Sequence, residues 1–253
     1  MRRLLPAGLA VFLAFMLFQA APALAQSFTF DTGGDQADAT ARIIQLVALL
    51  TVLSLAPSIL IMMTSFTRIV VVLSFLRQAL GTQSSPPNTV IVSLALFLTA
   101  FVMAPTLEEA WNSGIQPYVD GQIGEEQAFE RTVAPVKRFM LTHVRDQDLR
   151  LFMDMSRSQT PADSADTPLQ ALIPAFMISE LKRAFEIAFL LFVPFIIIDM
   201  VVASVLMSMG MMMLPPIIIA LPFKLIFFTL VDGWYLVAGS LVQSFSGQIP
   251  GGG

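Results

Sequence analysis

The chain has 253 residues, of which 56% are hydrophobic and only 13% are charged, and its formal net charge is -4 at pH 7. A soluble domain carries about twice that share of charged residues, so the composition indicates a membrane protein. Because the chain has no cysteine and a single histidine, it excludes disulfides and thiolate or imidazole clusters, and its acidic balance argues against nucleic acid as a partner.

The first 25 residues have the pattern of a cleaved secretory signal peptide. Two arginines precede an apolar run at 9–18, and a small-residue cleavage site, Ala23-Leu24-Ala25, follows it. An uncleaved anchor is the alternative, but the run is short for a membrane span. We therefore expect residues 26–42 to form an N-terminal segment outside the cytoplasm.

Residues 43–105 are predicted to form a first apolar helical hairpin. Its first part, 43–80, is too long for one span and is expected to break or kink at Pro57. Its second part, 90–103, is expected to end at Pro105 and is short for a full crossing.

Residues 106–168 form the only sustained polar stretch, which is acidic on balance. Helical patterning near 125–155 is followed by a tail at 156–168 that is rich in Ser, Thr, Pro and Asp and is expected to be flexible. An external N-terminus and two hairpins would place this stretch outside the cytoplasm. His143 has no neighbours at ligand spacing, so we expect it at the surface.

Residues 169–241 are predicted to form a second helical hairpin, followed by a C-terminal tail at 242–253. Its two apolar arms, 169–209 and 217–241, are separated only by a short loop. No lysine or arginine occurs in that loop, although the positive-inside rule favours them in cytoplasmic loops.

The loop of the second hairpin, residues 210–216, contains the methionines Met211, Met212 and Met213 in a row. Methionine is unbranched and polarizable, so such a row can seal against partners of varying shape. Gly210 permits a tight turn, while Pro215 and Pro216 cannot extend the preceding helix. The triplet is therefore expected at a helix end. A buried turn without further function is the simpler alternative.

Charged residues inside the apolar regions are costly, at about 2.5–3.5 kcal/mol each in the middle of a membrane helix. In the first hairpin, Arg68 and Arg77 are nine positions apart and so lie on opposite faces of a helix. They cannot form one anion site, and we interpret both as assembly contacts.

The charged residues of the second hairpin are interpreted as a structural or inter-subunit ion-pair network: Glu180, Lys182, Arg183, Glu186, Asp199 and Lys224. The i,i+3 spacing allows Glu180 to pair with Arg183. The i,i+4 spacing allows Lys182 to pair with Glu186. Asp199 and Lys224 have no local partner, so they are expected to meet each other or a neighbouring subunit.

Proline-interrupted helices and buried charges are tolerated at membrane depth where protein or a cavity covers the freed polar groups. Copies arranged in a ring would supply that cover, and their Met loops would converge into a deformable apolar constriction. The expected fold class is an all-α membrane protein. It has two long kinked helical hairpins with a polar helical extracytoplasmic segment between them, and it assembles into a ring.

Several strings of the sequence resemble the FliP family of flagellar export-gate proteins. They are MTSFTR at 63–68, FLRQALGTQ at 75–83, SPPN at 85–88, PAFMISELKRAF at 174–185, GMMMLPP at 210–216, LPFK at 221–224 and VDGW at 231–234. The resemblance covers residues 42–241, and motifs of this length do not arise by chance. The signal peptide and the acidic external segment favour the flagellar branch over the injectisome branch.

This resemblance implies five copies around an axis, joined by the FliQ and FliR proteins and other export-apparatus proteins in the bacterial inner membrane and basal body. It implies passage of unfolded flagellar subunits, with Met211, Met212 and Met213 as the gasket of the closed channel. Family complexes are held largely above the membrane plane, which would account for charges in apolar helices. Membrane lipid is an expected partner, whereas no cofactor, metal ion or catalytic residue is expected.

An ion or solute transporter is the alternative function, because broken helices and intramembrane charges also bind small substrates. Transporters of this kind usually contain inverted repeats, and the two hairpins share no similarity beyond length. The sequence contains no P-loop, so the driving force must come from partners or the membrane potential. These observations favour a non-enzymatic channel subunit.

Overall fold

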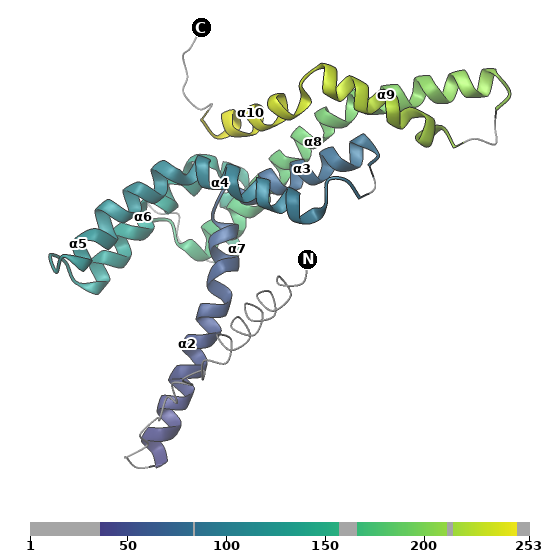
Figure 1. The fold of residues 1–253 in the computed structure, drawn as a ribbon. Coiled ribbons are helices and arrows are strands. Elements are labelled where there is room, and N and C mark those ends of the chain that lie inside the picture. Colours follow the sequence, from purple (N-terminus) through teal and green to yellow (C-terminus); the bar gives the residue numbers. More distant parts are fainter. Residues whose placement is uncertain (1–35, 83, 157–165, 212–214, 247–253) are drawn as a thin grey trace, which may run out of the picture. The chain divides into compact units, whose positions relative to one another are not determined.

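The computed structural model describes residues 36–82, 84–156, 166–211 and 215–246, which form helices and connecting turns without a strand (Figure 1). The expected all-α class is thus confirmed for these residues. The elements are α2 (Gln36–Met62), α3 (Phe66–Leu80), α4 (Asn88–Ala110), the π-helix η1 (Trp111–Ile115), α5 (Gln116–Val119), α6 (Glu125–His143), α7 (Asp146–Met155), α8 (Leu169–Ser208), α9 (Pro216–Leu230) and α10 (Gly233–Ser246). The expected signal peptide, most of the polar tail, Met212 and Met213 lie outside the described residues.

The chain divides within α2 into two compact units, residues 1–52 and 53–253. The described part of the first unit is helical. In the second unit, the break between the first apolar helices comes after Met62, and the expected break at Pro57 is wrong. A proline removes only one helical hydrogen bond. The Thr64 hydroxyl donates to the carbonyl oxygen of Ile61 at 2.9 Å, and such a side-chain bond competes with continuation of the helix.

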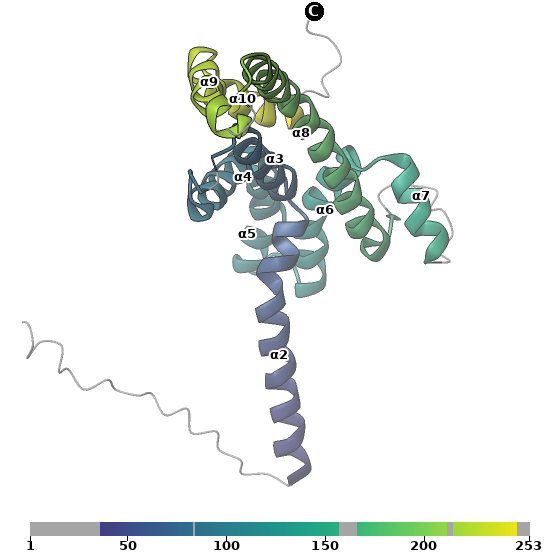
Figure 2. The same cartoon turned by 90° about the vertical axis from the view of Figure 1, so that its right-hand side faces the viewer.

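The core of the second unit is built around α3, which packs against α4, α8 and α9 (Figures 1 and 2). Because α3 has neighbours on several sides, its sequence is apolar at most positions and not only along one stripe. The α3 side chains in this core are Ile69, Val72, Leu73, Leu76, Ala79 and Leu80.

The second apolar helix does not end at Pro105, as the sequence had suggested. α4 continues through Pro105 into η1 and α5, so that residues 88–119 form one helical stretch long and apolar enough to cross a membrane. The missing N–H of a proline is tolerated where the helix packs on a neighbour, and α4 packs against α6. Residues 106–119, with which the sequence was expected to begin its polar stretch, therefore continue the helix that starts at Asn88.

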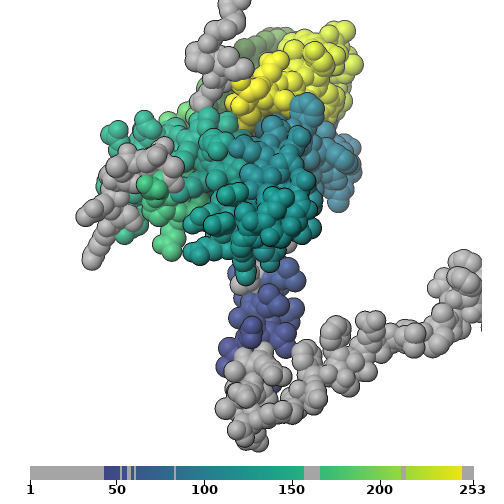
Figure 3. Space-filling model, turned by 90° about the vertical axis from the view of Figure 1, so that its left-hand side faces the viewer, coloured from purple at the N-terminus to yellow at the C-terminus, as the bar shows by residue number. Residues whose placement is uncertain are grey.

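The polar stretch forms α6 and α7, in agreement with the helical pattern near 125–155, and both helices pack against α8 (Figure 2). His143 is only 4% exposed, so the expected surface position is wrong. Its ring lies 4.5 Å from that of Phe139 and 5.4 Å from that of Phe245, between ring centroids. Aromatic packing between α6 and α10 buries it, where α10 (yellow) adjoins the α4–α6 surface (teal) in Figure 3.

α8 has 40 residues and continues through Pro174 and Pro194. At 1.5 Å per residue it is about 60 Å long, twice the thickness of the hydrocarbon core of a membrane. α9 and α10 are long and apolar enough to cross a membrane only when taken together, and they are bent by 63° at their junction. α10 extends to Ser246, beyond the boundary expected at Leu241.

The π-helix gives a test of the close packing between η1 and α6. A Cβ added at Gly114 would lie 2.1 Å from Thr132 Oγ1 and 2.7 Å from the Thr132 backbone nitrogen. We expect Gly114→Ala to lower the free energy of unfolding in mixed SDS micelles by about 1–3 kcal/mol, because the backbones must separate.

Gly239→Ala is the matched control, since Gly239 lies inside α10 with no side-chain or remote backbone atom within 4 Å of an added Cβ. This change should stabilise the helix by about 0.5–1 kcal/mol. Equal effects of the two substitutions would contradict the close approach at Gly114.

Candidate functional site

The loop between α8 and α9 begins with a tightly capped helix end. Gly210 has a φ of +72°, and its N–H donates to the carbonyl of Met207 at 3.1 Å. The N–H of Met211 donates to the carbonyl of Leu206 at 3.0 Å. These two bonds form a Schellman motif, in which glycine adopts the left-handed conformation without a Cβ clash. Gly210 therefore fixes where α8 stops.

The other end of the loop is set by Pro215 and Pro216. Pro216 is the first residue of α9, where its missing N–H costs no helical hydrogen bond and its fixed φ favours the helix. The Pro215 carbonyl accepts from the N–H of Ile218 at 3.1 Å. Met211 is 41% exposed, while Met212 and Met213 lie outside the described residues. An exposed thioether thus stands directly after a rigid helix end.

Away from the loop, an ion pair joins the two helices that flank it, α8 and α9. Lys224 Nζ donates to Asp199 Oδ2 at 2.7 Å and to the carbonyl oxygen of Ala79 at 3.1 Å. Lys224 is 3% exposed, whereas the Asp199 side chain is 35% exposed. Asp199 Oδ1 is buried and has no hydrogen-bond partner. The sequence left two possibilities for Asp199 and Lys224, namely each other or a neighbouring subunit. In the structure they pair with each other.

A second ion pair joins α3 to α8 and is fully buried. Arg68 Nε donates to Glu180 Oε2 at 2.8 Å, and Arg68 Nη2 donates to Glu180 Oε1 at 2.5 Å. The two parallel bonds match the planar guanidinium to the carboxylate, the strongest geometry for such a pair. Both oxygens of Glu180 therefore face Arg68, and not Arg183 as the spacing along the helix had suggested.

Arg68 also holds the end of α10. Its Nη1 donates to the carbonyl oxygen of Ser244 at 3.2 Å and to the Ser244 hydroxyl at 2.9 Å. The guanidinium carbon lies 3.7 Å from the centre of the Phe245 ring. The last carbonyls of a helix lack partners within the helix, and a cation there also interacts favourably with the helix dipole. One side chain thereby connects α3, α8 and α10.

The other charged candidates lie nearer the surface. Lys182 and Glu186 form the expected i,i+4 contact along α8 at 3.6 Å, with exposed side chains. Arg183 is partly buried. Arg77 donates to the carbonyl of Pro86 at 3.3 Å, in the connection between α3 and α4. The assembly roles assigned to Arg68 and Arg77 stay predictions.

Sequence reasoning missed Ser244 and Phe245, which it assigned to a C-terminal tail. The signal was present, since Val237, Leu241 and Phe245 are spaced by four residues along one helix face. It also missed the contact of Ser179 with Asp148, whose hydroxyl–carboxylate distance is 2.6 Å. No spacing rule connects residues so far apart in sequence. Among the residues that the structure describes, no three His, Cys, Asp or Glu side chains could together hold a metal ion.

Comparison with known proteins identifies the family of this chain. The sequence profile of the FliP family matches residues 49–241. The flagellar biosynthetic protein FliP of Caulobacter vibrioides is 64% identical over 225 residues, which cover 89% of this chain and 85% of the relative. That of Bacillus subtilis is 57% identical over 202 residues, covering 80% of this chain and 91% of the relative. The resemblance seen in the sequence is thus confirmed.

The buried Arg68–Glu180 pair predicts a large asymmetry between single and double substitutions. Glu180→Gln should lower the free energy of unfolding in mixed SDS micelles by about 3–5 kcal/mol, because it leaves a buried guanidinium without its counter-charge. The double substitution Arg68→Met with Glu180→Leu should recover most of that loss, since no buried charge then remains.

The exposed pair of Arg138 with Glu109, at 2.8 Å, is the control for the buried pair. Arg138→Met should change the free energy of unfolding by less than about 1 kcal/mol. A Glu180→Gln effect as small as that of the control would show that the buried pair does not hold α3 on α8.

Proposed function

Because the chain belongs to the FliP family, we propose that it forms part of the wall of a channel through which unfolded flagellar subunits leave the cytoplasm. Membership of this family makes the chain a membrane component of the flagellar export apparatus and not an enzyme. The channel, its gasket and its other subunits are the further steps that we propose here.

The distribution of charge along α8 supports a defined position in the membrane. Four of its five charged residues fall within residues 169–186, and α6 and α7 pack against α8. Residues 187–208 are about 33 Å long, enough to cross the hydrocarbon core, and their only charge, Asp199, is paired with Lys224. In this arrangement the second half of α8 crosses the inner membrane. Its first half lies with α6 and α7 on the extracytoplasmic side.

The exposed apolar surface supports an assembly of several copies. Phe189, Leu190 and Ile218 are 67%, 69% and 64% exposed on α8 and α9. A monomeric soluble protein rarely exposes so many large apolar side chains, so lipid or protein covers them in the membrane. We propose that five copies form a ring and that the FliQ and FliR proteins join them.

The α8–α9 loop supplies the gasket in this proposal, and it is the observation that carries the function. Both of its ends are fixed, by the Schellman motif at Gly210 and by the prolines that start α9. Between them the chain offers Met211, Met212 and Met213, whose side chains repack at little cost. α8 and α9 pack on each other, and in this proposal they form a hairpin whose loop meets those of the other copies at the axis. Contact between apolar side chains there closes the channel by dewetting.

Replacing Met211, Met212 and Met213 together by glycine tests the gasket. We expect the assembled complex, reconstituted with its partner subunits in lipid vesicles, to release a trapped small dye faster than the wild type. The physical reason is that glycine removes the apolar bulk that excludes water from the constriction.

Met200→Ala with Met207→Ala is the matched control, because these methionines are exposed on α8 outside the loop. Vesicles carrying this variant should retain the dye as well as the wild type does. A triplet variant that assembles normally and stays equally tight would refute the gasket. Release that saturates with solute concentration would favour a transporter instead.

A further inference from the structure

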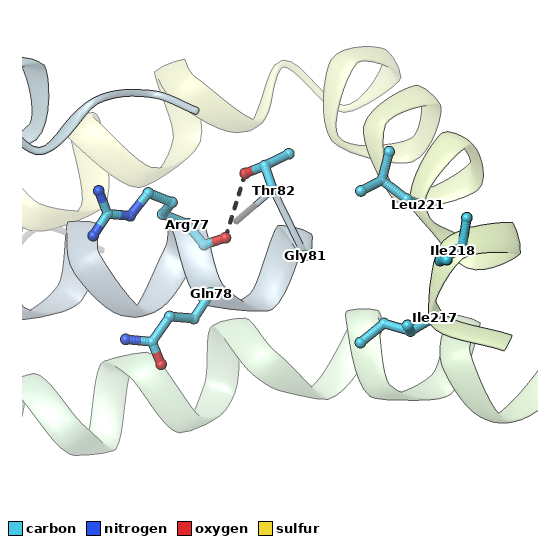
Figure 4. A pocket seen from close by; sticks show the side chains of 7 residues that line it. All are labelled: Arg77, Gln78, Gly81, Thr82, Ile217, Ile218 and Leu221. Atoms are coloured by element: carbon cyan, nitrogen blue, oxygen red, sulfur yellow. Dashed lines mark hydrogen bonds between the residues drawn. The ribbon is translucent and has the colours of Figure 1, made fainter. Parts of the chain in front are cut away.

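The start of α9 stands apart from the end of α3 across a cavity of about 570 Å³. Figure 4 shows Ile217 and Leu221 pointing toward the end of α3 across this space, while the Arg77 guanidinium points away from the start of α9. Apolar packing against α3 therefore contributes little to fixing the position of the first turns of α9. The lining residues are Arg77, Gln78, Gly81, Thr82, Ile217, Ile218 and Leu221.

At the edge of this cavity α9 does reach α3. A Cβ built on Gly81 would lie 3.9 Å from Leu221 Cδ1 and 4.0 Å from Lys224 Nζ. The Lys224 ammonium donates there to the Ala79 carbonyl, in the last turn of α3, and to the Asp199 carboxylate of α8. A single buried nitrogen is thus bonded to groups of two other helices.

This contact is directional in a way that the apolar contacts around it are not. A buried ammonium is stable only where acceptors surround it. Its two acceptors are a backbone carbonyl of α3 and the Asp199 carboxylate of α8. The Ala79 carbonyl, near the C-terminus of α3, also carries the negative end of the helix dipole. Sliding of α9 by a helical turn along α3 or along α8 would therefore remove the ammonium from at least one acceptor.

We propose that Lys224 is a positioning residue of the export gate, which sets where the start of α9 stands relative to α3. Pro216 and Lys224 belong to the same helix, eight residues apart, so a shift at Lys224 moves the point where the loop joins α9. The proposal rests on the function proposed above, because only in a gate does the position of this loop decide permeability. The positioning role is tested by measuring a distance between α3 and α9, and not by measuring export activity.

The distance across the cavity can be measured directly, because the chain has no cysteine. Gln78→Cys with Ile218→Cys places two nitroxide labels on opposite walls, in a complex diluted with unlabelled copies. We expect one narrow distance distribution by electron double resonance. Lys224→Met should broaden or shift it, whereas Lys224→Arg, which keeps a cation with several donors, should restore most of the narrow peak.

Two further variants separate the three-helix contact from the ion pair alone. Lys182→Met removes the exposed pair with Glu186 on α8 and should leave the distance unchanged. Exchanging the charges, Asp199→Lys with Lys224→Asp, keeps a pair between α8 and α9 but presents an acceptor to the Ala79 carbonyl. We expect the exchanged variant to show the broadened distribution. A narrow wild-type distance in it would overturn the role of Ala79.

Lys224→Met leaves the Asp199 carboxylate without its counter-charge, so the variant with Asp199→Asn added covers the case in which the single variant does not assemble. This neutral pair should assemble and still broaden the distance. A wild-type distribution in the neutral pair, or in an assembled Lys224→Met complex, overturns the proposal.

Dye release from the same vesicles distinguishes this proposal from the proposed function. If the glycine variant of the Met triplet leaks and Lys224→Met both shifts the distance and leaks, both proposals are supported. If the distance shifts but neither variant leaks, the positioning role stands and the gate function fails. If the triplet variant leaks while Lys224→Met changes neither distance nor leak, the positioning role fails and the gate stands.

Discussion

A charge buried among apolar helices must find its partner inside the protein, and α3 meets this requirement near both of its ends. Near its start, Arg68 pairs with Glu180 of α8, and near its end the Ala79 carbonyl accepts from Lys224. The contacts between these points are apolar and non-directional, so they do not by themselves select one register. The two polar contacts do, because a shift of one helical turn would leave buried charges unpaired. The surrounding helices then pack around a fixed α3–α8 pair.

The same requirement explains why α8 can carry four of its five charges. Glu180 is satisfied by a distant arginine within the chain, and Asp199 by a lysine of α9. Lys182 and Glu186 pair with each other and remain exposed, in the half of α8 against which the polar helices pack. α8 therefore has two parts: a charged half suited to water and protein, and an apolar half suited to lipid. Its length, about twice that of a membrane span, makes both roles possible.

Sequence periodicity predicted the helices well where a long apolar or amphipathic run decides the structure, as in α6, α7 and α8. It failed at Pro57 and Pro105, because a proline removes only one helical hydrogen bond. At Pro105 the helix also packs against α6, which helps to compensate for the lost bond. Pairing was predictable where spacing along one helix is decisive, as for Lys182 with Glu186. It was also anticipated for Asp199 and Lys224, because neither had a local partner. Glu180 pairs with Arg68, 112 positions away in the chain, and not with Arg183 on its own helix. A bidentate bond to a buried guanidinium stabilises a buried carboxylate more than a contact with a partly exposed arginine does. Such long-range choices depend on the packing of the helices, which spacing does not encode.

The seal proposed for the Met loop, made of flexible side chains, imposes a condition on the backbone that carries it. Methionine can adapt to a neighbouring surface only if its Cα position is held, since a mobile backbone would open gaps faster than side chains could fill them. The chain meets this condition with rigid chemistry at each end of the loop: a left-handed glycine that ends α8, and prolines that begin α9. The Lys224 contact extends the same constraint from the loop to α3. Flexible thioether side chains and a rigid backbone on either side of them are thus both required, because adaptable side chains close a gap only if the helices that carry them stay in place.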